Sequence, residues 1–340
     1  MVSMIKVNVI AEKFIGQANG VYTAFLETVD ALKKHPEIQL SINEPWENCD
    51  VVHAHSIGLE YILKSFKYRD KLIVSAHVVP DSFIGSLILS EWWKPIAKWY
   101  LKLAFSRAKL VIAVSPMVKI ELEKIDVKTN IQVLCNSVDR EKFKLNPDLR
   151  QKLRAKHGIG ADEFVVTCVG QIQPRKGIYD FLETAQNLPH IRFVWVGGKP
   201  FGRITADYDV LEKTVAQAPS NVLFTGIVDF QDMPGYYAMS DVFFMPSYQE
   251  NFAFATIEAS SVQLPLVLRD NVEYPGSLFT HYLKGKTALD FTHVIDHLYR
   301  DSAFYKQWQQ ESETLASNYE LSAHVRQLLA FYKEVSGKKA

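Results

Sequence analysis

The sequence predicts an α/β protein built on doubly wound parallel sheets. Short apolar strands alternate with amphipathic helical patterns from the first residues onward, which is the order of elements in βαβ units. This pattern stops at a polar segment, residues 136–160, and then starts again with another strand, loop and helix. Because 340 residues can bury two separate cores, we predict two similar domains in tandem, joined at the polar segment.

The first half contains predicted strands at residues 5–10, 50–55, 71–77, 110–115 and 131–135. A loop with Gly16 and Gly20 follows the first strand and precedes a helical pattern at residues 21–34. Ligands of open α/β sheets bind at the carboxyl ends of strands, where this loop and His77 lie. The loop lacks the GxGxxG spacing, so it fits either a phosphate-binding turn or an ordinary turn between strand and helix.

The second half repeats the pattern, with predicted strands at residues 164–170, 191–196, 222–224, 241–245 and 264–268. Arg175, Lys176 and Gly177 lie in the loop between its first strand and a helix at residues 178–187. Two adjacent cations near a helix N-terminus favour a diphosphate ligand, and a pair of solvated surface charges is the alternative. Residues 317–335 carry a further helical apolar stripe.

Two carboxylates, Glu250 and Glu258, flank a run of small and aromatic residues after a strand that ends at Pro246. We expect a helix to begin near Phe252. Unpaired N–H groups at the start of a helix, beside an acid, suit a phosphate-bearing ligand with hydroxyl groups. The alternative is an acid favoured by the helix dipole, with a second acid on a solvated helix face.

Taken in order, these motifs resemble those of the retaining glycosyltransferases with the GT-B fold, in the large family 4 that uses nucleotide-sugar donors. The most specific part is the pair of glutamates separated by seven residues. The resemblance covers nearly the whole chain. Its pieces are the N-terminal glycine loop, the strand that ends in His77, residues 136–139 with Phe143, residues 170–177, residues 237–241 and residues 246–259.

The resemblance implies two Rossmann-like domains that face a cleft. Residues 1–145 would form an N-terminal domain that binds the acceptor and the membrane. Residues 146–316 would form the domain that binds the nucleotide sugar, and residues 317–340 a C-terminal helix that crosses back to the first domain.

The resemblance also implies roles in donor binding. Glu250 matches the glutamate that holds the hydroxyl groups of the donor sugar, and Glu258 matches the one that binds the ribose. The backbone of Asn251, Phe252 and Ala253 would lie near the sugar and the diphosphate.

The same resemblance implies that the diphosphate leaves without a divalent metal or a cofactor, because Arg175 and Lys176 neutralise it. Gly16 and Gly20 would cradle the phosphates from the other domain. His77 matches a histidine near the donor sugar and the acceptor. The expected catalytic residues are therefore His77, Arg175, Lys176 and Glu250.

Three positions depart from the family pattern. Gln171 follows Gly170 where arginine is usual, so Arg175 would supply that charge. Ser137 and Ala253 stand where glycine is common. These departures concern the geometry of the expected phosphate clamp.

A basic, tryptophan-rich segment follows the strand that ends in His77. Residues 92–109 contain five basic residues and no acidic residue. Tryptophans beside lysines suit an anionic bilayer interface, and an amphipathic helix packed on the first sheet is the alternative. The residues expected at the membrane are Trp92, Trp93, Lys94, Lys98, Trp99 and Lys102.

This segment, with residues 77–81 and 268–274, resembles the bacterial diacylglycerol glycosyltransferases, best the members that add a second sugar. The implied activity transfers glucose or galactose from a UDP-sugar to glucosyl-diacylglycerol at the cytoplasmic face of the cell membrane. No apolar run approaches the roughly 20 residues of a membrane span, so we expect peripheral binding. A soluble family 4 enzyme acting on a sugar or polysaccharide and a nucleotide-sugar epimerase remain alternatives. The balance of 38 basic and 38 acidic residues gives no indication of nucleic-acid binding.

Overall fold

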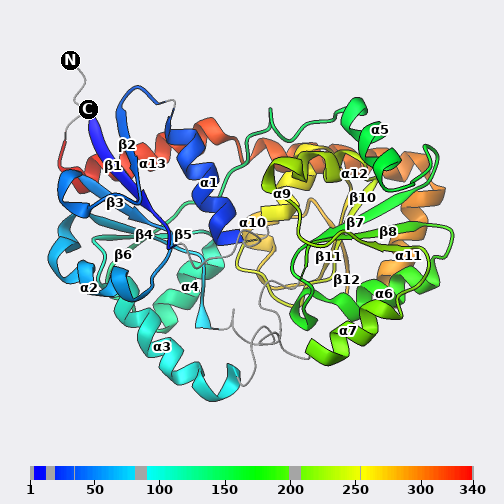
Figure 1. Cartoon of the computed structure of the whole chain (residues 1–340), viewed down its shortest axis with the longest axis horizontal. Helices are drawn as coiled ribbons and strands as arrows, with labels where there is room; N and C mark the ends of the chain where they lie inside the picture. The colour runs from blue at the N-terminus through cyan, green and yellow to red at the C-terminus, as the bar shows by residue number, and fades with distance from the viewer. Residues whose placement is uncertain are drawn as a thin grey trace. The chain divides into compact units, whose positions relative to one another are not determined.

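The computed structural model of the protein describes residues 4–12, 20–33, 35–80, 90–198, 208–252 and 254–338. The chain divides into two compact units, drawn in Figure 1 and described one at a time below. Unit 1 comprises Met1–Phe83, Glu91–Ser137 and Tyr319–Ala340, and unit 2 comprises Ile84–Ser90 and Val138–Asn318.

Unit 1 is built on a six-stranded parallel sheet with the order β2-β1-β3-β4-β5-β6. Its strands are β1 (Ile5–Ile10), β2 (Ile38–Ile42), β3 (Val51–Ala54), β4 (Leu72–Ala76), β5 (Leu110–Ala113) and β6 (Asn130–Val133). Its helices are α1 (Gly20–Lys33), α2 (Leu59–Tyr68), α3 (Ser90–Ser106), α4 (Pro116–Lys124) and α13 (Leu321–Ser336), with 3₁₀ turns η1 (Trp46–Asn48) and η2 (Arg69–Lys71).

The five strands predicted for the first half are confirmed as β1, β3, β4, β5 and β6. The sequence does not predict β2, which lies at the edge of the sheet and pairs with β1 alone. Gln39 and Ser41 interrupt the apolar residues of this strand. An edge strand with one exposed side tolerates such polar residues, so it lacks a strong apolar signal.

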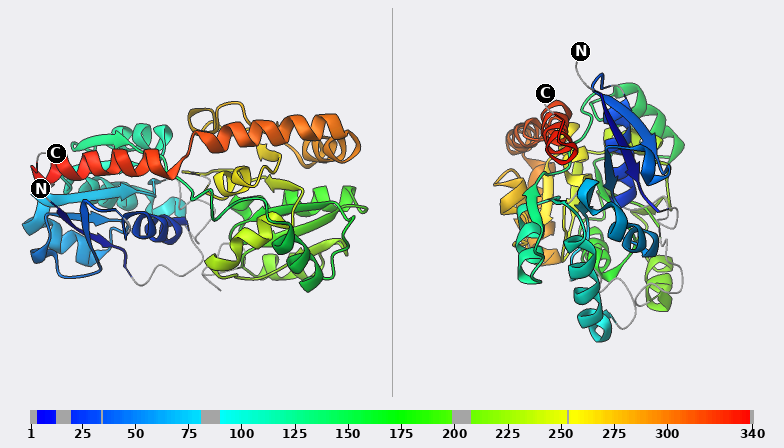
Figure 2. Two further views of the ribbon diagram at one scale, coloured as in Figure 1. Left: turned by 90° about the horizontal axis from the view of Figure 1, so that it is seen from above. Right: turned by 90° about the vertical axis from the view of Figure 1, so that its left-hand side faces the viewer.

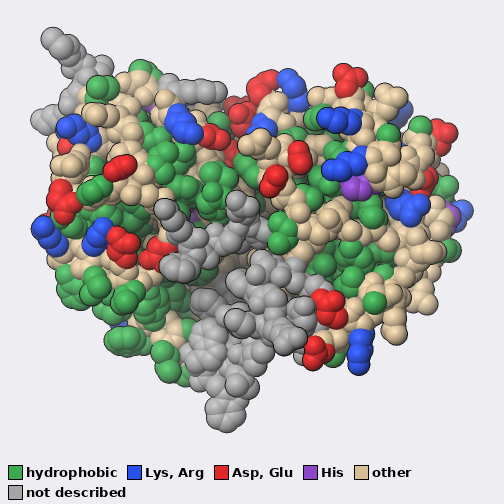
Figure 3. Space-filling view, in the orientation of Figure 1, with side chains coloured by type: hydrophobic (Ala, Val, Ile, Leu, Met, Phe, Trp, Pro, Cys, Tyr) green, Lys and Arg blue, Asp and Glu red, His purple; other side chains and the backbone are tan. Residues whose placement is uncertain are grey.

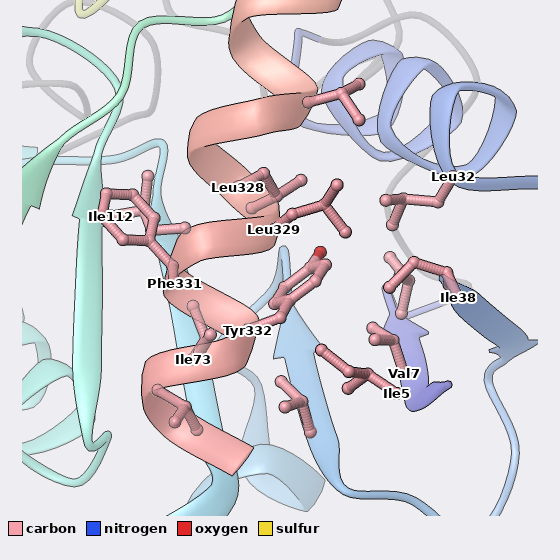
Figure 4. Packing of buried hydrophobic residues seen from close by; sticks show 14 of the residues in the cluster. Ile5, Val7, Leu32, Ile38, Ile73, Ile112, Leu328, Leu329, Phe331 and Tyr332 are labelled. Atoms are coloured by element: carbon pink, nitrogen blue, oxygen red, sulfur yellow. The ribbon is translucent and has the colours of Figure 1, made fainter. Parts of the chain in front are cut away.

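The last helix of the chain completes the core of unit 1. Figure 4 shows Leu328, Leu329 and Tyr332 of α13 beside Ile5 and Val7 of β1. In Figure 2, α13 is the red helix that runs alongside the blue strands. Burial of such apolar side chains stabilises a fold by about 1.5–3 kcal/mol each. The first sheet therefore depends on residues from the far end of the chain.

Unit 2 contains a second six-stranded parallel sheet, with the order β12-β11-β10-β7-β8-β9. Its strands are β7 (Val165–Val169), β8 (Arg192–Val196), β9 (Val222–Phe224), β10 (Val242–Met245), β11 (Leu266–Arg269) and β12 (Leu283–Gly285). Its longer helices are α5 (Pro147–Lys156), α6 (Ile178–Asn187), α7 (Tyr208–Ala216), α9 (Phe254–Ser261), α11 (Ala288–Arg300) and α12 (Ser302–Ser317). Shorter pieces are α8 (Met233–Ala238), α10 (Pro275–Leu278), η4 (Pro174–Lys176) and η6 (Phe230–Asp232).

The predicted fold class, α/β with two doubly wound parallel sheets, is confirmed in both units. The five strands predicted in the second half are β7 to β11, whereas the short edge strand β12 is not predicted. The proposed cleft between two domains stays a prediction.

The polar segment at residues 136–160 is not only a junction, because it contains helix α5. Asn146 caps this helix by accepting a hydrogen bond of 3.0 Å from the N–H of Leu149. Arg154 is buried and donates to the carbonyl oxygen of Met239 and to the Asp241 carboxylate. The sequence does not predict this helix, because it contains no long apolar run. Hydrogen bonds and an ion pair of its polar side chains hold it in place instead.

One predicted helix start is confirmed and another is wrong by a few residues. Helix α9 begins at Phe254, near the predicted Phe252, and residue 253 between them lies outside the described part of the chain. The helix predicted at residues 317–335 is α13, which begins at Leu321. Ser317 still belongs to α12, and Glu320 has an extended backbone that separates the two helices.

The packing of α13 predicts that Leu328→Ala lowers the free energy of unfolding by about 2–5 kcal/mol, because truncation leaves a cavity against β1. Leu328 is 1% exposed. Guanidinium denaturation followed by tryptophan fluorescence measures the effect. Gln327→Ala, at the exposed neighbouring position, is the control and is expected to change the free energy by less than about 0.5 kcal/mol. Equal losses in both variants would contradict the role of α13 in the core.

Candidate functional site

The strand order of unit 2 reverses between β7 and β10. From β7 the sheet continues to β8 and β9, and from β10 it continues to β11 and β12. In a doubly wound sheet the carboxyl ends of two such strands border the usual ligand site. Residues 170–177 follow β7 and residues 246–252 follow β10, so these two loops define the candidate site.

Gly177 allows the two loops to touch. Its φ of +76° is left-handed, and a Cβ atom there would lie 2.3 Å from the carbonyl oxygen of Pro246. Only glycine fits such a position without displacing backbone. A hydrogen bond of 2.8 Å from the Tyr248 N–H to the Arg175 carbonyl also joins the loops.

Lys176 and Glu250 form a buried ion pair between these loops. The Nζ of Lys176 donates to Oε1 of Glu250 at 2.5 Å, and the side chains are 16% and 8% exposed. Burial alone would raise the pKa of Glu250, but the charges of Lys176 and Arg175 outweigh it and hold the pKa below its ordinary value. Glu250 is therefore an ionised acceptor near neutral pH.

The rest of the predicted loop residues lie around this pair. Arg175 donates from Nη1 to the carbonyl oxygen of Gln249 at 2.7 Å. Gln249 in turn donates from Nε2 to Oδ1 of Asn251 at 2.9 Å. The Phe252 ring stands edge-on to Phe254, with centroids 5.9 Å apart. Ala253, also predicted here, lies outside the described residues.

Glu258, the second predicted glutamate, is buried on α9 at 5% exposure. Its Oε2 accepts a hydrogen bond of 2.5 Å from the hydroxyl of Tyr237 on α8. The alternative of an acid on a solvated helix face is therefore wrong for Glu258. Glu250 is also buried, at 7% exposure.

Three residues that the sequence analysis does not single out brace the loop after β10. Arg269, at the end of β11, donates to the Pro246 carbonyl at 2.9 Å and to the Asp180 carboxylate at 2.8 Å. The Tyr248 hydroxyl donates to the same Asp180 oxygen at 2.7 Å, and its ring lies 3.8 Å from the Arg269 guanidinium carbon. These residues come from separate elements, so no local spacing in the sequence signals them.

In unit 1, His77 belongs to a cluster of histidines at the carboxyl ends of β3 and β4. Nε2 of His77 lies 3.1 Å from Nδ1 of His55, and the two rings stack with centroids 5.2 Å apart. His53 lies deeper, with Nδ1 2.8 Å from the Tyr332 hydroxyl and Nε2 2.8 Å from the Ser75 hydroxyl. The predicted strands at residues 50–55 and 71–77 end in His55 and His77, and the structure brings these two histidines into contact.

Burial keeps these histidines neutral. It lowers the pKa of His77 to about 4. It lowers the pKa of His53 to about 3, with a smaller effect from a charge on His77. The pKa of His55 is also well below its ordinary value, first by burial and then by its histidine neighbours. A neutral imidazole has one donor and one acceptor nitrogen, which suits contact with a hydroxyl group.

The predicted glycine loop is described only at its end. Gly20 is the first residue of α1 and is exposed, while Gly16 lies outside the described residues. Phosphate binding by this loop stays a prediction.

Helix α3, predicted to meet a membrane, presents apolar side chains to solvent. Ile96 and Trp99 are 67% and 65% exposed, whereas Ala97 and Leu101 are buried. The alternative from the sequence, in which Ile96 and Trp99 pack on the first sheet, is therefore wrong for these two residues.

Two basic residues of α3, Lys98 and Lys102, are also at the surface. Lys98 is exposed, and Lys102 forms an ion pair of 2.8 Å with Asp126. The remaining residues of the predicted membrane group belong to α3 by their backbone, but their side chains lie outside the described part; they are Trp92, Trp93 and Lys94.

Helix α2 extends this exposed apolar surface. Leu59, Leu63 and Phe66 are 73%, 64% and 60% exposed. The hydroxyl of Tyr61 donates to the Ala104 carbonyl at 3.0 Å and so ties α2 to α3. Figure 3 shows hydrophobic side chains gathered at the lower left, where Figure 1 draws these two helices.

Within the described ranges, no group of histidine, cysteine and acidic side chains is placed to hold a metal ion. The sequence contains one Asp-x-Asp triplet at residues 207–209, and its first aspartate is outside the described part. No helix among the described residues has the length and apolar character needed to cross a bilayer.

Two units in one chain, each with a doubly wound parallel sheet, are the architecture of the GT-B class. Models of two families agree with this class: "Glycosyl transferases group 1" matches residues 150–315, and "Glycosyltransferase Family 4" matches residues 28–142. The chain belongs to this glycosyltransferase family and is a hexosyltransferase, as the motifs predict. The epimerase alternative is thereby removed.

Two curated relatives share most of their length with this chain. The α-galactosylglucosyldiacylglycerol synthase of Streptococcus pneumoniae is 32% identical over 331 residues, which cover 95% of this chain and 87% of that protein. The processive diacylglycerol α-glucosyltransferase of Acholeplasma laidlawii is 28% identical over 261 residues, 74% of this chain and 76% of that protein. The resemblance to diacylglycerol glycosyltransferases is confirmed as a similarity.

Solved structures confirm the GT-B fold. Sucrose-phosphate synthase from Thermosynechococcus elongatus has a TM-score of 0.82 at 15% identity, covering 98% of this chain and all of that one (100%). Anabaena HepE in complex with UDP and glucose has a TM-score of 0.77 at 17% identity, covering 96% and 99%. Identities this low show the shared fold alone.

The neutral histidine cluster predicts a loss of stability in acid. The unfolded chain protonates its histidines near pH 6.5, whereas the folded chain protonates His77 near pH 4 and His53 near pH 3. Their contribution to stability is therefore complete above about pH 6.5 and falls as the pH drops toward 4. For His77 alone the difference corresponds to about 3 kcal/mol.

Denaturation at pH 7 and pH 4.5 measures this effect. His77→Gln removes one titrating group, so the loss between the two pH values should shrink by about 3 kcal/mol at most. His293→Gln, at an exposed position on α11, is the matched control and should retain the wild-type loss. The same loss in all three proteins would show that His77 is not held neutral by the fold.

Proposed function

We propose that the protein is a retaining hexosyltransferase that moves glucose or galactose from a UDP-sugar to a membrane glycolipid, glucosyl-diacylglycerol. The buried Lys176–Glu250 pair at the switch point of unit 2 carries this proposal. Support for the acceptor comes from the names of the two curated relatives, which are a galactosylglucosyldiacylglycerol synthase and a diacylglycerol glucosyltransferase. Support for the donor comes from the motif resemblance to enzymes that use nucleotide sugars, and HepE, which has the same fold, was solved with UDP and glucose.

The donor would bind at the loops after β7 and β10. Glu250 is ionised and buried, so it can accept hydrogen bonds from the hydroxyl groups of the sugar. The first N–H groups of α9 have no partner within their own helix and favour the phosphates, near Asn251, Phe252 and Ala253. Glu258 would accept hydrogen bonds from the ribose.

The leaving group would be stabilised by charge. An ammonium has three donors, so Lys176 can bind both Glu250 and a phosphate oxygen, and Arg175 adds a second cation. Departure of UDP would give the sugar oxocarbenium character, and the acceptor hydroxyl would attack from the same face. The leaving phosphate oxygen would take the proton of that hydroxyl. Glu250 acts here as a binder of the sugar, with the cations providing electrostatic stabilisation.

Unit 1 would supply the acceptor side of the reaction. His77 is neutral and can exchange hydrogen bonds with hydroxyl groups of the sugar or acceptor. The glycine loop with Gly16 and Gly20 would add backbone N–H groups for the phosphates.

The exposed surface of α2 and α3 would hold the protein on the cytoplasmic face of the membrane. Apolar side chains at this surface enter the headgroup region, while Lys98 and Lys102 meet anionic lipid. Trp92, Trp93 and Lys94 belong to the same proposal. A soluble enzyme of this family that acts on a sugar or polysaccharide would not need such a surface.

The donor proposal predicts that Glu250→Gln lowers kcat/KM about 100- to 1000-fold, because an acceptor and its charge leave the site. The assay follows labelled hexose from UDP-glucose or UDP-galactose to glucosyl-diacylglycerol in anionic vesicles, and NMR of the product gives its anomeric configuration. Glu183→Gln, on the exposed face of α6, should keep wild-type activity. Absence of transfer from both donors by the wild-type protein would refute the proposed function.

A double variant separates binding from stability in the same experiment. Glu250→Gln leaves Lys176 as an unpaired buried charge, which lowers stability by about 3–5 kcal/mol. Adding Lys176→Met removes that charge, so stability should return while activity does not. Recovery of activity together with stability would mean that the pair is only structural.

The membrane proposal predicts that Ile96→Ser with Trp99→Ser weakens binding to anionic vesicles about 10- to 100-fold. The variant loses the free energy gained when two apolar side chains move from water into the bilayer interface. Sedimentation of the protein with vesicles at low and high salt measures this. Val210→Ser with Ile227→Ser changes two residues of unit 2 that are both 54% exposed, and it should leave binding unchanged. Equal binding by all three proteins would favour the soluble enzyme.

A further inference from the structure

Tyr237 and Glu258 form a buried hydrogen bond between two helices of unit 2. The Tyr237 hydroxyl on α8 donates to Oε2 of Glu258 on α9 at 2.5 Å. Tyr237 is 0% exposed and Glu258 is 5% exposed. The hydrogen bond therefore lies within the protein interior and involves Glu258, which is predicted to bind the nucleotide-sugar donor.

The ring of Tyr237 is fixed by its neighbours. Phe143 meets it edge-on with centroids 5.8 Å apart, and Phe243 lies 6.1 Å away at a tilt of 47°. Both phenylalanines are fully buried. Because the ring cannot swing into solvent, its hydroxyl has a defined position relative to α9.

The hydroxyl also keeps its proton. Burial raises the pKa of Tyr237 well above its ordinary value, and the negative charge of Glu258 raises it further. Tyr237 therefore donates to the carboxylate throughout the physiological pH range. The last torsion of a glutamate side chain has only a broad preference of its own, so a fixed donor decides the plane of its carboxylate.

We propose that Tyr237 is a positioning residue for the nucleotide: it orients the Glu258 carboxylate to accept the two hydroxyl hydrogens of the donor's ribose. The inference rests on the proposed function, in which Glu258 binds that ribose. A carboxylate has about four acceptor sites, so a bond from Tyr237 leaves capacity for a vicinal diol. The hydrogen-bond donor to Glu250 is the cation of Lys176, whereas the donor to Glu258 is the neutral hydroxyl of Tyr237, which does not neutralise the carboxylate.

A merely structural tyrosine and a positioning tyrosine differ in one measurable property. Loss of a structural hydroxyl lowers thermal stability and affects ribonucleotide and deoxyribonucleotide donors alike. Loss of a positioning hydroxyl reduces the preference for the donor that carries the 2′-hydroxyl. The preference, as a ratio of two kcat/KM values on one protein, is insensitive to the fraction of folded enzyme.

The test compares a UDP-sugar with its 2′-deoxyribose analogue in the wild-type protein, Tyr237→Phe, Glu258→Gln and Tyr236→Phe. Tyr236 is the matched control, because it lies on the same helix, is 2% exposed, and places its hydroxyl 3.3 Å from His157. We expect the wild-type protein and Tyr236→Phe to prefer the ribose donor by about 10- to 100-fold, the size of a hydrogen bond to a charged group. Tyr237→Phe should lose at least about fivefold of this preference, chiefly through KM.

The outcomes separate this inference from the proposed function. If Glu258→Gln keeps the wild-type preference, the assignment of Glu258 to the ribose is wrong, and the inference falls with it. If Glu258→Gln loses the preference and Tyr237→Phe retains it, the proposed function stands and the positioning role is overturned. Loss in both variants, with Tyr236→Phe unchanged, supports the proposal.

A second variant covers the case in which Tyr237→Phe does not fold. Phe143→Leu leaves the hydroxyl in place but loosens the packing that fixes the ring. We expect it to reduce the ribose preference in the same direction as Tyr237→Phe. An unchanged preference in Phe143→Leu would then overturn the proposal.

Discussion

The buried ion pair between Lys176 and Glu250 constrains everything else at the site of unit 2. Taking two charges out of water costs more than their attraction returns unless the surroundings help. Here the second cation, Arg175, lowers the energy of the carboxylate, and the left-handed Gly177 lets one loop reach the other. The apolar alternative would be as stable, so the pair is better explained by its place at the carboxyl ends of β7 and β10, where ligands of such sheets bind.

The buried ion pair of Arg154 with Asp241 is different, because Arg154 makes several hydrogen bonds within the fold. Arg154 donates to four backbone carbonyls and to Asp241, which accounts for every nitrogen of its guanidinium. Lys176 has three donors and, among the described residues, one hydrogen bond, to Glu250. Arg154 is thus committed to contacts within the fold, whereas the ammonium of Lys176 has donors left that could bind an anion. This difference supports the proposed role of Lys176 at the diphosphate.

Much of this arrangement could be predicted from the sequence, because strands, glycines and charged loop residues follow one another within short stretches of the chain. The central strands β1, β3, β4, β7 and β10 are apolar runs followed by polar residues, and the loops that follow them carry Lys176 and Glu250. What escaped prediction depends on distant partners. Helix α5 is not predicted because its sequence is rich in charged residues, and the edge strands β2 and β12 are not predicted because they lack apolar runs. Tyr237 and Arg269 lie in segments that the resemblance includes, but their hydrogen bonds to Glu258 and Asp180 join separate elements and are not visible in local spacing.

The last helix of the chain, α13, packs against the strands at the beginning of the chain, so both ends contribute to the core of unit 1. Leu328 and Leu329 of α13 pack on the first sheet, and Tyr332 places its hydroxyl 2.8 Å from His53. The ring of His53 is tilted by 39° against that of His55 with centroids 4.5 Å apart, and His55 contacts His77. A helix needed to bury the apolar face of unit 1 thus also provides a polar partner for the innermost histidine. Since an unpaired buried imidazole is costly, the position of α13 and the geometry around His77 are set by the same contact.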